Sequence, residues 1–386
     1  MKITHIHIER FRGFQNEDFE VGSLLTAIAG QNGTQKSTLL GIITQTFTLK
    51  TEDSMRVEKP LCGGSYISAF KDKFRLSPTF DKPKGHEWTI SFDAGMDDFT
   101  VESIKRTGDP NVRFWKKGTR QEGDGYISFP TIFLSLKRLV PVAEEAKIIT
   151  DDTLLTQEEL NEFKQLHNKI LIAQTPISSA TTITSKNKQS IGVSTELYDW
   201  NQNSMGQDNL GKIILALFSF KRLHDKYPRQ YKGGILAIDE MDATMYPASQ
   251  VELLKVLRKY ASKLNLQILF TTHSMSLLKA MDDLVQEVTK KEETANQAKI
   301  LYLKKVDDKI AIKQGVNFKG IQLDLNVVAE GNNRKKNRIT AYTEDKENIL
   351  FVKAILKSKA FVLDFVDVTL PCSTLMELVT KRVPAF

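Results

Sequence analysis

Cysteine is scarce in this chain. Only two of its 386 residues are cysteines, Cys62 and Cys372, and they lie far apart in the sequence. Neither has neighbours at the spacing of a zinc site, and two thiols cannot form the disulfide framework of a small secreted domain. The composition therefore excludes a disulfide scaffold and a cysteine-based zinc site, and it favours a protein of the reducing cytoplasm.

Long apolar runs are missing too. No stretch reaches about 18 apolar residues, the length that a membrane-spanning helix requires, and Met1–Thr4 leads into a strand-like segment without the apolar core of a signal peptide. No heptad pattern persists long enough for a coiled-coil arm, and there is no internal repeat. We therefore expect a cytoplasmic globular protein of roughly two or three domains without membrane contact.

The charge balance is moderately basic. Charged residues make up 26% of the chain and hydrophobic residues 41%, as in ordinary globular proteins. The formal net charge of +7 permits contact with nucleic acid but does not establish it. Basic residues cluster at 71–75, 113–120 and 334–338. Such runs are more often a solvated face than a binding site, and we expect the same here.

The segment Ala29–Thr38 carries the most informative motif. It follows the phosphate-binding pattern of a glycine, four residues and then Gly-Lys-Ser, except that Gln35 replaces the second glycine. A buried strand over 24–29 precedes the loop and a helix from Ser37 follows it, which is the setting that the motif requires. Because a glycine before the lysine lets the backbone approach a phosphate, Gln35 makes nucleotide binding a firmer prediction than hydrolysis.

This loop predicts how ATP is held. Lys36 is expected to reach the β- and γ-phosphates, and the Ser37 hydroxyl to bind Mg²⁺. The residues expected to contact the nucleotide are Gln31, Asn32, Gly33, Thr34, Gln35, Lys36, Ser37 and Thr38.

Two further apolar strands end in residues that can act on a phosphate. The first, 231–238, runs into Asp239 and Glu240. A carboxylate at the end of a buried strand beside a phosphate loop holds magnesium, so Asp239 is expected to bind Mg²⁺ together with Ser37. Glu240 is placed to orient or deprotonate an attacking water. The second strand, 264–270, leads to His273, which can donate a hydrogen bond to the γ-phosphate.

The remaining periodicity predicts an α/β fold in several parts. Alternating runs separated by turns between about 52 and 130 indicate an antiparallel sheet, and alternation from Lys2 indicates a first strand with one buried face. Helices are predicted over 153–174, 209–223 and 249–263. The Ser/Thr/Lys-rich stretch 175–190 has few large apolar side chains, so we expect a mobile loop there.

Together these residues resemble the ABC-type ATPase heads of the branch that includes RecF, the zinc-hook repair ATPases, the structural-maintenance proteins and the overcoming-lysogenization-defect (OLD) proteins. The resemblance covers most of 1–315 and rests on Phe11–Phe14, Gly30–Thr38, Asp239–Glu240 and Thr272–Ser274. It implies an α/β P-loop ATPase head that binds ATP and Mg²⁺. Such a head has a mixed sheet, an antiparallel β subdomain and a helical lobe, here at about 145–225.

A short segment before the second strand resembles the ABC signature. Asn203–Asp208 contains Ser204, Gly206 and Gln207 in Ser-x-Gly-Gln order. The family's signature contacts the γ-phosphate held by a second subunit, so the resemblance implies a homodimer or higher homo-oligomer that encloses nucleotide between heads. The segment 242–247 likewise resembles the D-loop of the family.

The tail 339–386 follows a predicted linker over 316–338. Its order of strand, acidic turn, helix and strand resembles the start of a TOPRIM nuclease domain, with Glu344 at the position of the first glutamate. That site also needs a later Asp-x-Asp pair, and Asp364 and Asp367 have the wrong spacing. We therefore interpret the tail as a truncated, inactive remnant.

The segments 70–77 and 129–139 resemble OLD-type proteins and their Septu-defence relatives, and the whole combination most resembles the ATPases of Septu antiphage defence. The resemblance implies an ATP-binding, slowly hydrolysing sensor and scaffold that controls a separate HNH-type nuclease, with DNA or RNA contacted by the complex. Three alternatives stay open. They are an OLD-type nuclease using Glu344, a RecF-like or structural-maintenance-like DNA-repair ATPase, and an ATP-gated scaffold in which Glu240 is idle.

Overall fold

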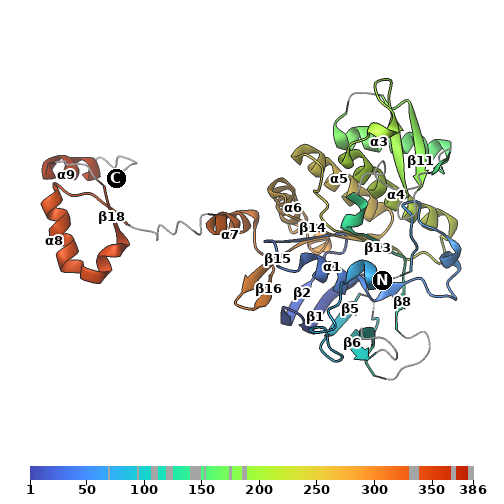
Figure 1. Ribbon diagram of the computed structural model, residues 1–386, viewed down its shortest axis with the longest axis horizontal. Coiled ribbons are helices and arrows are strands. Elements are labelled where there is room, and N and C mark those ends of the chain that lie inside the picture. The colour runs from blue at the N-terminus through green and yellow to red at the C-terminus, as the bar shows by residue number, and fades with distance from the viewer. Residues whose placement is uncertain are drawn as a thin grey trace. The chain divides into compact units, whose positions relative to one another are not determined.

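The computed structural model describes residues 1–67, 70–93, 95–105, 112–118, 125–139, 149–151, 154–173, 176–184, 189–329, 339–366 and 371–380. The chain forms two compact units, Met1–Gln322 and Leu323–Phe386 (Figure 1). All the predicted nucleotide-site residues belong to the first unit.

The centre of the first unit is a six-stranded mixed sheet in the order β16-β15-β3-β14-β13-β9. Its strands are β3 (Leu25–Gly30), β9 (Thr131–Leu134), β13 (Gly234–Ile238), β14 (Leu266–Thr272), β15 (Ala298–Val306) and β16 (Lys309–Lys313). All neighbours run parallel except the β15–β16 pair. β3, β13 and β14 are buried at every position, which explains their continuous apolar sequences. The mixed α/β sheet predicted from the sequence is thus confirmed.

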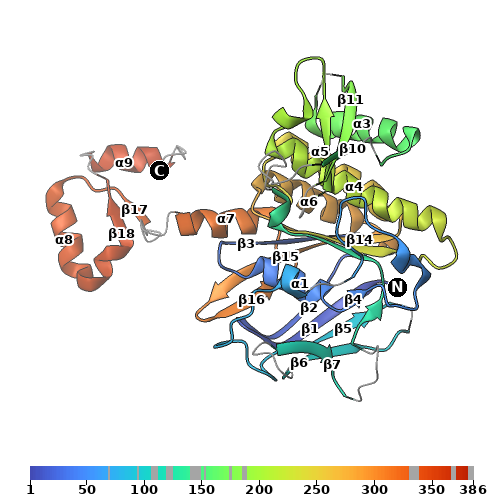
Figure 2. The same ribbon diagram turned by 45° about the vertical axis from the view of Figure 1, so that its right-hand side comes forward.

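Helices cover both faces of this sheet. α5 (Pro247–Lys263) and α6 (Met275–Val288) lie on one face, and α1 (Lys36–Thr44) lies on the other (Figure 1, Figure 2). Because β3, β14 and β13 run parallel, their carboxyl ends lie at the same edge of the sheet. α1 begins at this edge. That edge gathers the predicted site residues.

A five-stranded antiparallel sheet in the order β2-β1-β5-β6-β7 packs below α1 (Figure 2). Its strands are β1 (Ile3–Phe11), β2 (Phe14–Glu20), β5 (Glu87–Phe92), β6 (Phe99–Lys105) and β7 (Val112–Lys116). The predicted antiparallel sheet is confirmed. Phe11 stands at the centre of its aromatic core, against Phe74, Trp88 and Phe114. Shorter elements of this region are β4 (Phe47–Thr48), η1 (Ser54–Val57), α2 (Phe70–Lys73), β8 (Ile127–Ser128) and η2 (Leu136–Leu139).

The predicted helical lobe is only partly helical. α3 (Gln157–Leu171) and α4 (Met205–Lys226) are present, as expected from their periodicity. A three-stranded antiparallel sheet accompanies them, made of β10 (Ile149–Asp151), β11 (Ser179–Thr184) and β12 (Gln189–Ser194). A short helical turn, η4 (Trp200–Gln202), leads from β12 into α4.

The mobile loop predicted over 175–190 is therefore wrong where the structure describes it. β11 and the start of β12 occupy this stretch, and Ile183 and Ile191 are buried. The many Ser and Thr side chains of β11 and β12 are compatible with a strand that a helix covers. They lack the large apolar side chains by which a strand is usually predicted from sequence.

The second unit contains β17 (Ile339–Ala341), α8 (Lys346–Leu356), η6 (Lys357–Val362), β18 (Leu363–Phe365) and α9 (Cys372–Thr380). β17 and β18 pair in parallel, which matches the predicted strand–helix–strand order. α7 (Phe318–Ala329) occupies much of the segment predicted as a linker. The basic cluster 334–338 and Asp367 lie outside the described residues. No helix in the described part of the chain is long and apolar enough to cross a membrane.

Candidate nucleotide-binding site

The phosphate loop connects β3 to α1 as the motif requires. β3 ends at Gly30 and α1 begins at Lys36, with Gln35 as its N-cap. Gln35 has a φ of 62°, in the left-handed region that favours glycine. This conformation explains why glycine is usual at the position and shows that glutamine has kept the backbone path of the loop.

The Gln35 side chain packs against the turn between β1 and β2. A Cβ atom placed on Gly13 of that turn would lie 2.9 Å from Gln35 Nε2 and 2.7 Å from Ile310 Cγ1. Gln35 Oε1 is buried and has no hydrogen-bond partner among the described residues. The substitution thus adds a contact between the phosphate loop, the β1–β2 turn and β16.

Lys36 folds back over the loop. Its Nζ donates hydrogen bonds to the carbonyl oxygens of Gly30, at 3.1 Å, and Gln31, at 2.9 Å. Burial lowers the pKa of Lys36, while Glu240, Asp239 and Asp242 act in the opposite direction. The ammonium group therefore lies within electrostatic reach of the acidic residues that follow β13.

Ser37 and Asp239 meet at the edge of the sheet, although 202 positions separate them in the sequence. Ser37 Oγ donates to Asp239 Oδ1 at 2.9 Å, and Thr271 Oγ1 donates to the same oxygen at 2.7 Å. Asp239 is buried, and the two hydroxyls hold its carboxylate in place. A hydroxyl and a carboxylate oxygen are the hard ligands that Mg²⁺ prefers, and this pair fits the predicted metal site.

Glu240 follows in a strained backbone conformation, with a φ of 50°. Its backbone N–H donates to Thr271 Oγ1 at 2.6 Å, and its carbonyl oxygen accepts from Arg138 Nη2 at 2.7 Å. The backbone of Glu240 is thus fixed on both sides, which fixes the direction in which its side chain leaves the sheet edge.

His273 follows the end of β14. Its backbone N–H donates to Asp242 Oδ1 at 3.4 Å. Burial lowers the pKa of the His273 imidazole, and the Lys36 ammonium lowers it further. The ring is therefore neutral at neutral pH and can donate one hydrogen bond. Lys36 and His273 each lie within electrostatic reach of Asp239 and Glu240, so the structure brings these predicted site residues together.

The signature-like residues lie at the start of α4. Ser204 is its N-cap and forms a capping box with Gln207. The Gln207 amide also donates to the Tyr198 hydroxyl at 2.8 Å. A Cβ atom on Gly206 would lie 2.5 Å from the carbonyl oxygen of Thr244, so only glycine fits this contact with the segment after Glu240. A role for Ser204, Gly206 and Gln207 in a second subunit's site stays a prediction.

Two arginines that sequence reasoning did not assign lie next to the site. Arg138 is 2% exposed and contacts the Glu240 backbone. Arg12 Nη1 donates to Thr38 Oγ1 of α1 at 3.5 Å and contacts Asp81 through Nε and Nη2, at 3.2 and 3.1 Å. A basic residue just after an apolar strand was the only sequence signal for Arg138. The Arg12–Asp81 pair, 69 positions apart, had none.

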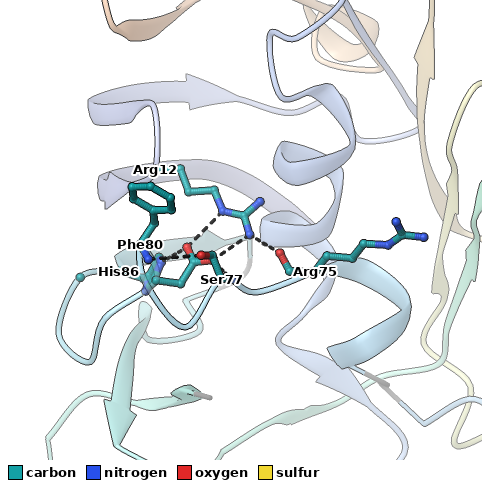
Figure 3. A pocket seen from close by; sticks show the side chains of 7 residues that line it. Arg12, Arg75, Ser77, Phe80 and His86 are labelled. Atoms are coloured by element: carbon teal, nitrogen blue, oxygen red, sulfur yellow. Dashed lines mark hydrogen bonds and ion pairs between the residues drawn. The ribbon is translucent and has the colours of Figure 1, made fainter. Parts of the chain in front are cut away.

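Arg12 borders a pocket beside α1, lined also by Arg75, Ser77, Phe80 and His86 (Figure 3). Asp81 is buried beneath it and accepts a hydrogen bond from His86 Nε2 at 3.0 Å. Burial opposes ionisation of Asp81, but hydrogen bonds from Arg12, the Ser77 backbone and His86 lower the pKa of its carboxyl group overall. Asp81 thus stays charged and holds the Arg12 guanidinium near the phosphate loop.

Comparisons with known proteins support an ATPase domain. Residues 135–278 match a family model described as an AAA ATPase domain. A comparison with curated proteins gives no match. The match to the family model confirms the expected ATPase class, over less than half of the chain.

Solved structures with a similar fold include the SMC head domain from Thermotoga maritima, at 14% identity and a TM-score of 0.45 over 82% of this chain and 100% of that one. The Pyrococcus furiosus Smc head bound to the C-terminal domain of ScpA has 12% identity and a TM-score of 0.44, over 85% and 99%. RecF of the RecFOR pathway has 11% identity and a TM-score of 0.40, over 81% and 98%. These likenesses are low, and the functional conclusions rest on the geometry of the site.

Proposed function

We propose that this chain is a Mg²⁺- and ATP-binding head that hydrolyses ATP slowly and acts as a homodimer. The observation that carries the proposal is the hydrogen bond of 2.9 Å between Ser37 Oγ and Asp239 Oδ1. It joins a hydroxyl at the start of α1 to the carboxylate that follows β13. A phosphate-binding helix start beside such a pair is the arrangement that Mg²⁺-nucleotide binding needs.

Each site residue has a role that its surroundings support. Lys36 exchanges its bonds to the Gly30 and Gln31 carbonyls for phosphate oxygens. Ser37 and Asp239 would hold Mg²⁺, which neutralises phosphate charge when bound. Glu240 orients the attacking water, and neutral His273 donates a hydrogen bond to the γ-phosphate.

Slow turnover follows from the phosphate loop itself. Gln35 packs on Gly13, and Lys36 is bonded to two loop carbonyls. Both contacts resist the rearrangements that each cycle of binding and release requires. The signature-like residues Ser204 and Gly206 would complete the site of the second head, as the resemblance implies.

The first experiment measures ATP binding, hydrolysis and oligomer mass for the wild-type chain, Lys36→Ala and Glu240→Gln. We expect Lys36→Ala to weaken ATP binding by about tenfold or more, because it removes a phosphate-binding charge. We expect Glu240→Gln to bind ATP, to lose turnover and to stabilise the dimer. Lys255→Ala, at an exposed position of α5, is the control. Unchanged binding by Lys36→Ala would refute the proposed site.

We further propose that the head is the sensor and scaffold of an antiphage complex with a separate HNH-type nuclease. The support is the resemblance to Septu-type ATPases together with the tail, in which β17, α8 and β18 follow the TOPRIM order and Asp364 and Asp367 lack the Asp-x-Asp spacing. Protection of cells against phage should require the nuclease and should be lost in Lys36→Ala. Magnesium-dependent nicking of DNA by the chain alone, abolished by Glu344→Ala, would instead establish the OLD-type alternative.

A further inference from the structure

Arg138 is one of the largest fully buried side chains described in the molecule, and it is a cation. Its Nε donates to Asn209 Oδ1 at 2.7 Å, and its Nη1 donates to the carbonyls of Leu134, at 3.2 Å, and Ser135, at 3.1 Å. Its Nη2 donates to the Glu240 carbonyl at 2.7 Å. These four acceptors, one side-chain amide oxygen and three backbone carbonyl oxygens, are all uncharged. The carboxylates of Asp239, Glu240 and Asp242 offset part of the cost of burying this charge. None of them is hydrogen-bonded to Arg138 within the described residues, so its burial needs an explanation beyond packing.

Asn209 extends this contact to the signature helix. It is on α4, one turn beyond Gly206, and it is fully buried. While its Oδ1 accepts from Arg138, its Nδ2 donates to the Ala243 carbonyl at 2.9 Å. The side chain therefore ties α4 to Arg138 and also to the segment that follows Glu240.

The other end of the contact is the candidate water-orienting residue. Arg138 and Thr271 hold the carbonyl and N–H of Glu240, whose φ of 50° is unfavourable for a side chain. Such a conformation persists only where the surroundings over-determine it. Arg138 is thus one of the two contacts that hold Glu240 in this conformation.

We propose that Arg138 is a positioning residue that links the signature helix α4 to Glu240. When a second head engages Ser204 and Gly206 at the start of α4, the displacement passes through Asn209 and Arg138 and aims Glu240 in the same chain. Each head would then hydrolyse its own ATP only after its signature has met the partner's nucleotide. This inference rests on the proposed ATPase function and deepens it, because it supplies the connection between the two sites of a dimer.

The test separates positioning from binding. Arg138→Lys keeps the charge but cannot make the same set of bonds, because lysine lacks the planar fork of arginine. We expect kcat to fall by about tenfold or more while the Kd for ATP changes by less than about threefold. Arg222→Lys is the matched control, since Arg222 is on the same α4 helix but bonds to Glu159 of α3.

A second variant keeps the test decisive if Arg138→Lys does not fold. Asn209→Ala leaves the Arg138–Glu240 bond in place and removes the link to α4. It should also lower kcat without a matching change in the Kd for ATP. In the double variant the two losses should not add, because either change breaks the same chain of contacts.

Three results would overturn the inference. They are a wild-type kcat in both variants, additive losses in the double variant, and equal losses of kcat and ATP affinity that follow a drop in unfolding temperature. A wild-type chain that binds no ATP would overturn the proposed function as well. Normal wild-type binding and turnover with any of the three results overturns only the role of Arg138.

Discussion

Strained residues surround the candidate site. Arg12, Gln35, Glu240 and Thr244 all have φ between 50° and 66°, although none is glycine. A left-handed backbone costs roughly 1–2 kcal/mol for a residue with a side chain. Each of these residues is on a segment that touches the phosphate loop or follows Asp239. Such strain would help an ATPase to move the phosphate loop or Glu240 between two conformations.

Replacing Gln35 with glycine tests this interpretation at the level of one residue. Glycine accepts a φ of 62° without penalty and removes the contact with Gly13. We expect release of ADP and turnover to accelerate by about fivefold, a barrier lower by roughly 1 kcal/mol, because glycine removes both the contact with Gly13 and the Cβ atom that restricts the backbone of the moving loop. Release is measured with a fluorescent ADP analogue.

Gln35→Ala serves as the control for this prediction. It removes the amide but keeps a Cβ in the left-handed conformation, so it should gain less than Gln35→Gly. Equal rates in both variants would show that backbone strain at position 35 does not limit the loop.

At the scale of elements, α3 contributes a buried histidine. The helix starts with a capping box of Thr156 and Glu159 and buries Phe163, His167 and Ile170. The His167 ring stacks on Phe163 with centroids 5.9 Å apart. Burial lowers the pKa of His167 to about 4, although the Asn168 side chain opposes this effect. The imidazole is therefore neutral in the folded protein.

This histidine predicts a loss of stability in acid. Because its pKa is lower in the folded chain than in the unfolded one, its contribution is complete above pH 6.5 and is lost as the pH falls toward 4. The shift corresponds to about 3 kcal/mol in full, at roughly 1.4 kcal/mol per pKa unit. Urea unfolding of the wild-type chain should therefore lose about 2 kcal/mol more between pH 7 and pH 4.5 than unfolding of His167→Phe. His224→Phe, at an exposed position of α4, should behave like the wild type.

The same scale shows what sequence could predict. β3, β13 and β14 were predictable because buried parallel strands are continuously apolar, and the phosphate loop, Asp239–Glu240 and His273 follow directly after them. β11 and β12 were not predictable, because their Ser- and Thr-rich sequences resemble those of loops and only packing against a helix makes them strands. Arg138 and the Arg12–Asp81 pair escaped because a buried polar contact between distant residues leaves no periodic trace in the sequence.

At the scale of the whole molecule, the two units differ in how well they are packed. The first unit holds the aromatic core and every residue of the candidate site. In the second unit, α8 has no buried residue, and Leu350, Phe351 and Ile355 are each at least 66% exposed. The described sheet there has two strands, too few for a stable core of its own.

We therefore expect a chain that stops after Ala329 to keep ATP binding. Its Kd for ATP should stay within about twofold of the full chain, and its thermal unfolding should stay within a few degrees, because α8 has no buried residue and the first unit holds the candidate site. Calorimetric titration and thermal unfolding measure the two quantities. A large loss of affinity would mean that the tail contributes to the nucleotide site.

The position of β3 in the central sheet has a consequence for biosynthesis. Among the strands of this sheet, β3 (Leu25–Gly30) is synthesised first. Its two neighbours are β14 (Leu266–Thr272) and β15 (Ala298–Val306), which are synthesised much later. More than three quarters of the chain must therefore leave the ribosome before both neighbours can pair with β3, the strand that precedes the phosphate loop. We therefore expect a growing chain to bind nucleotide only after β15 has left the ribosome.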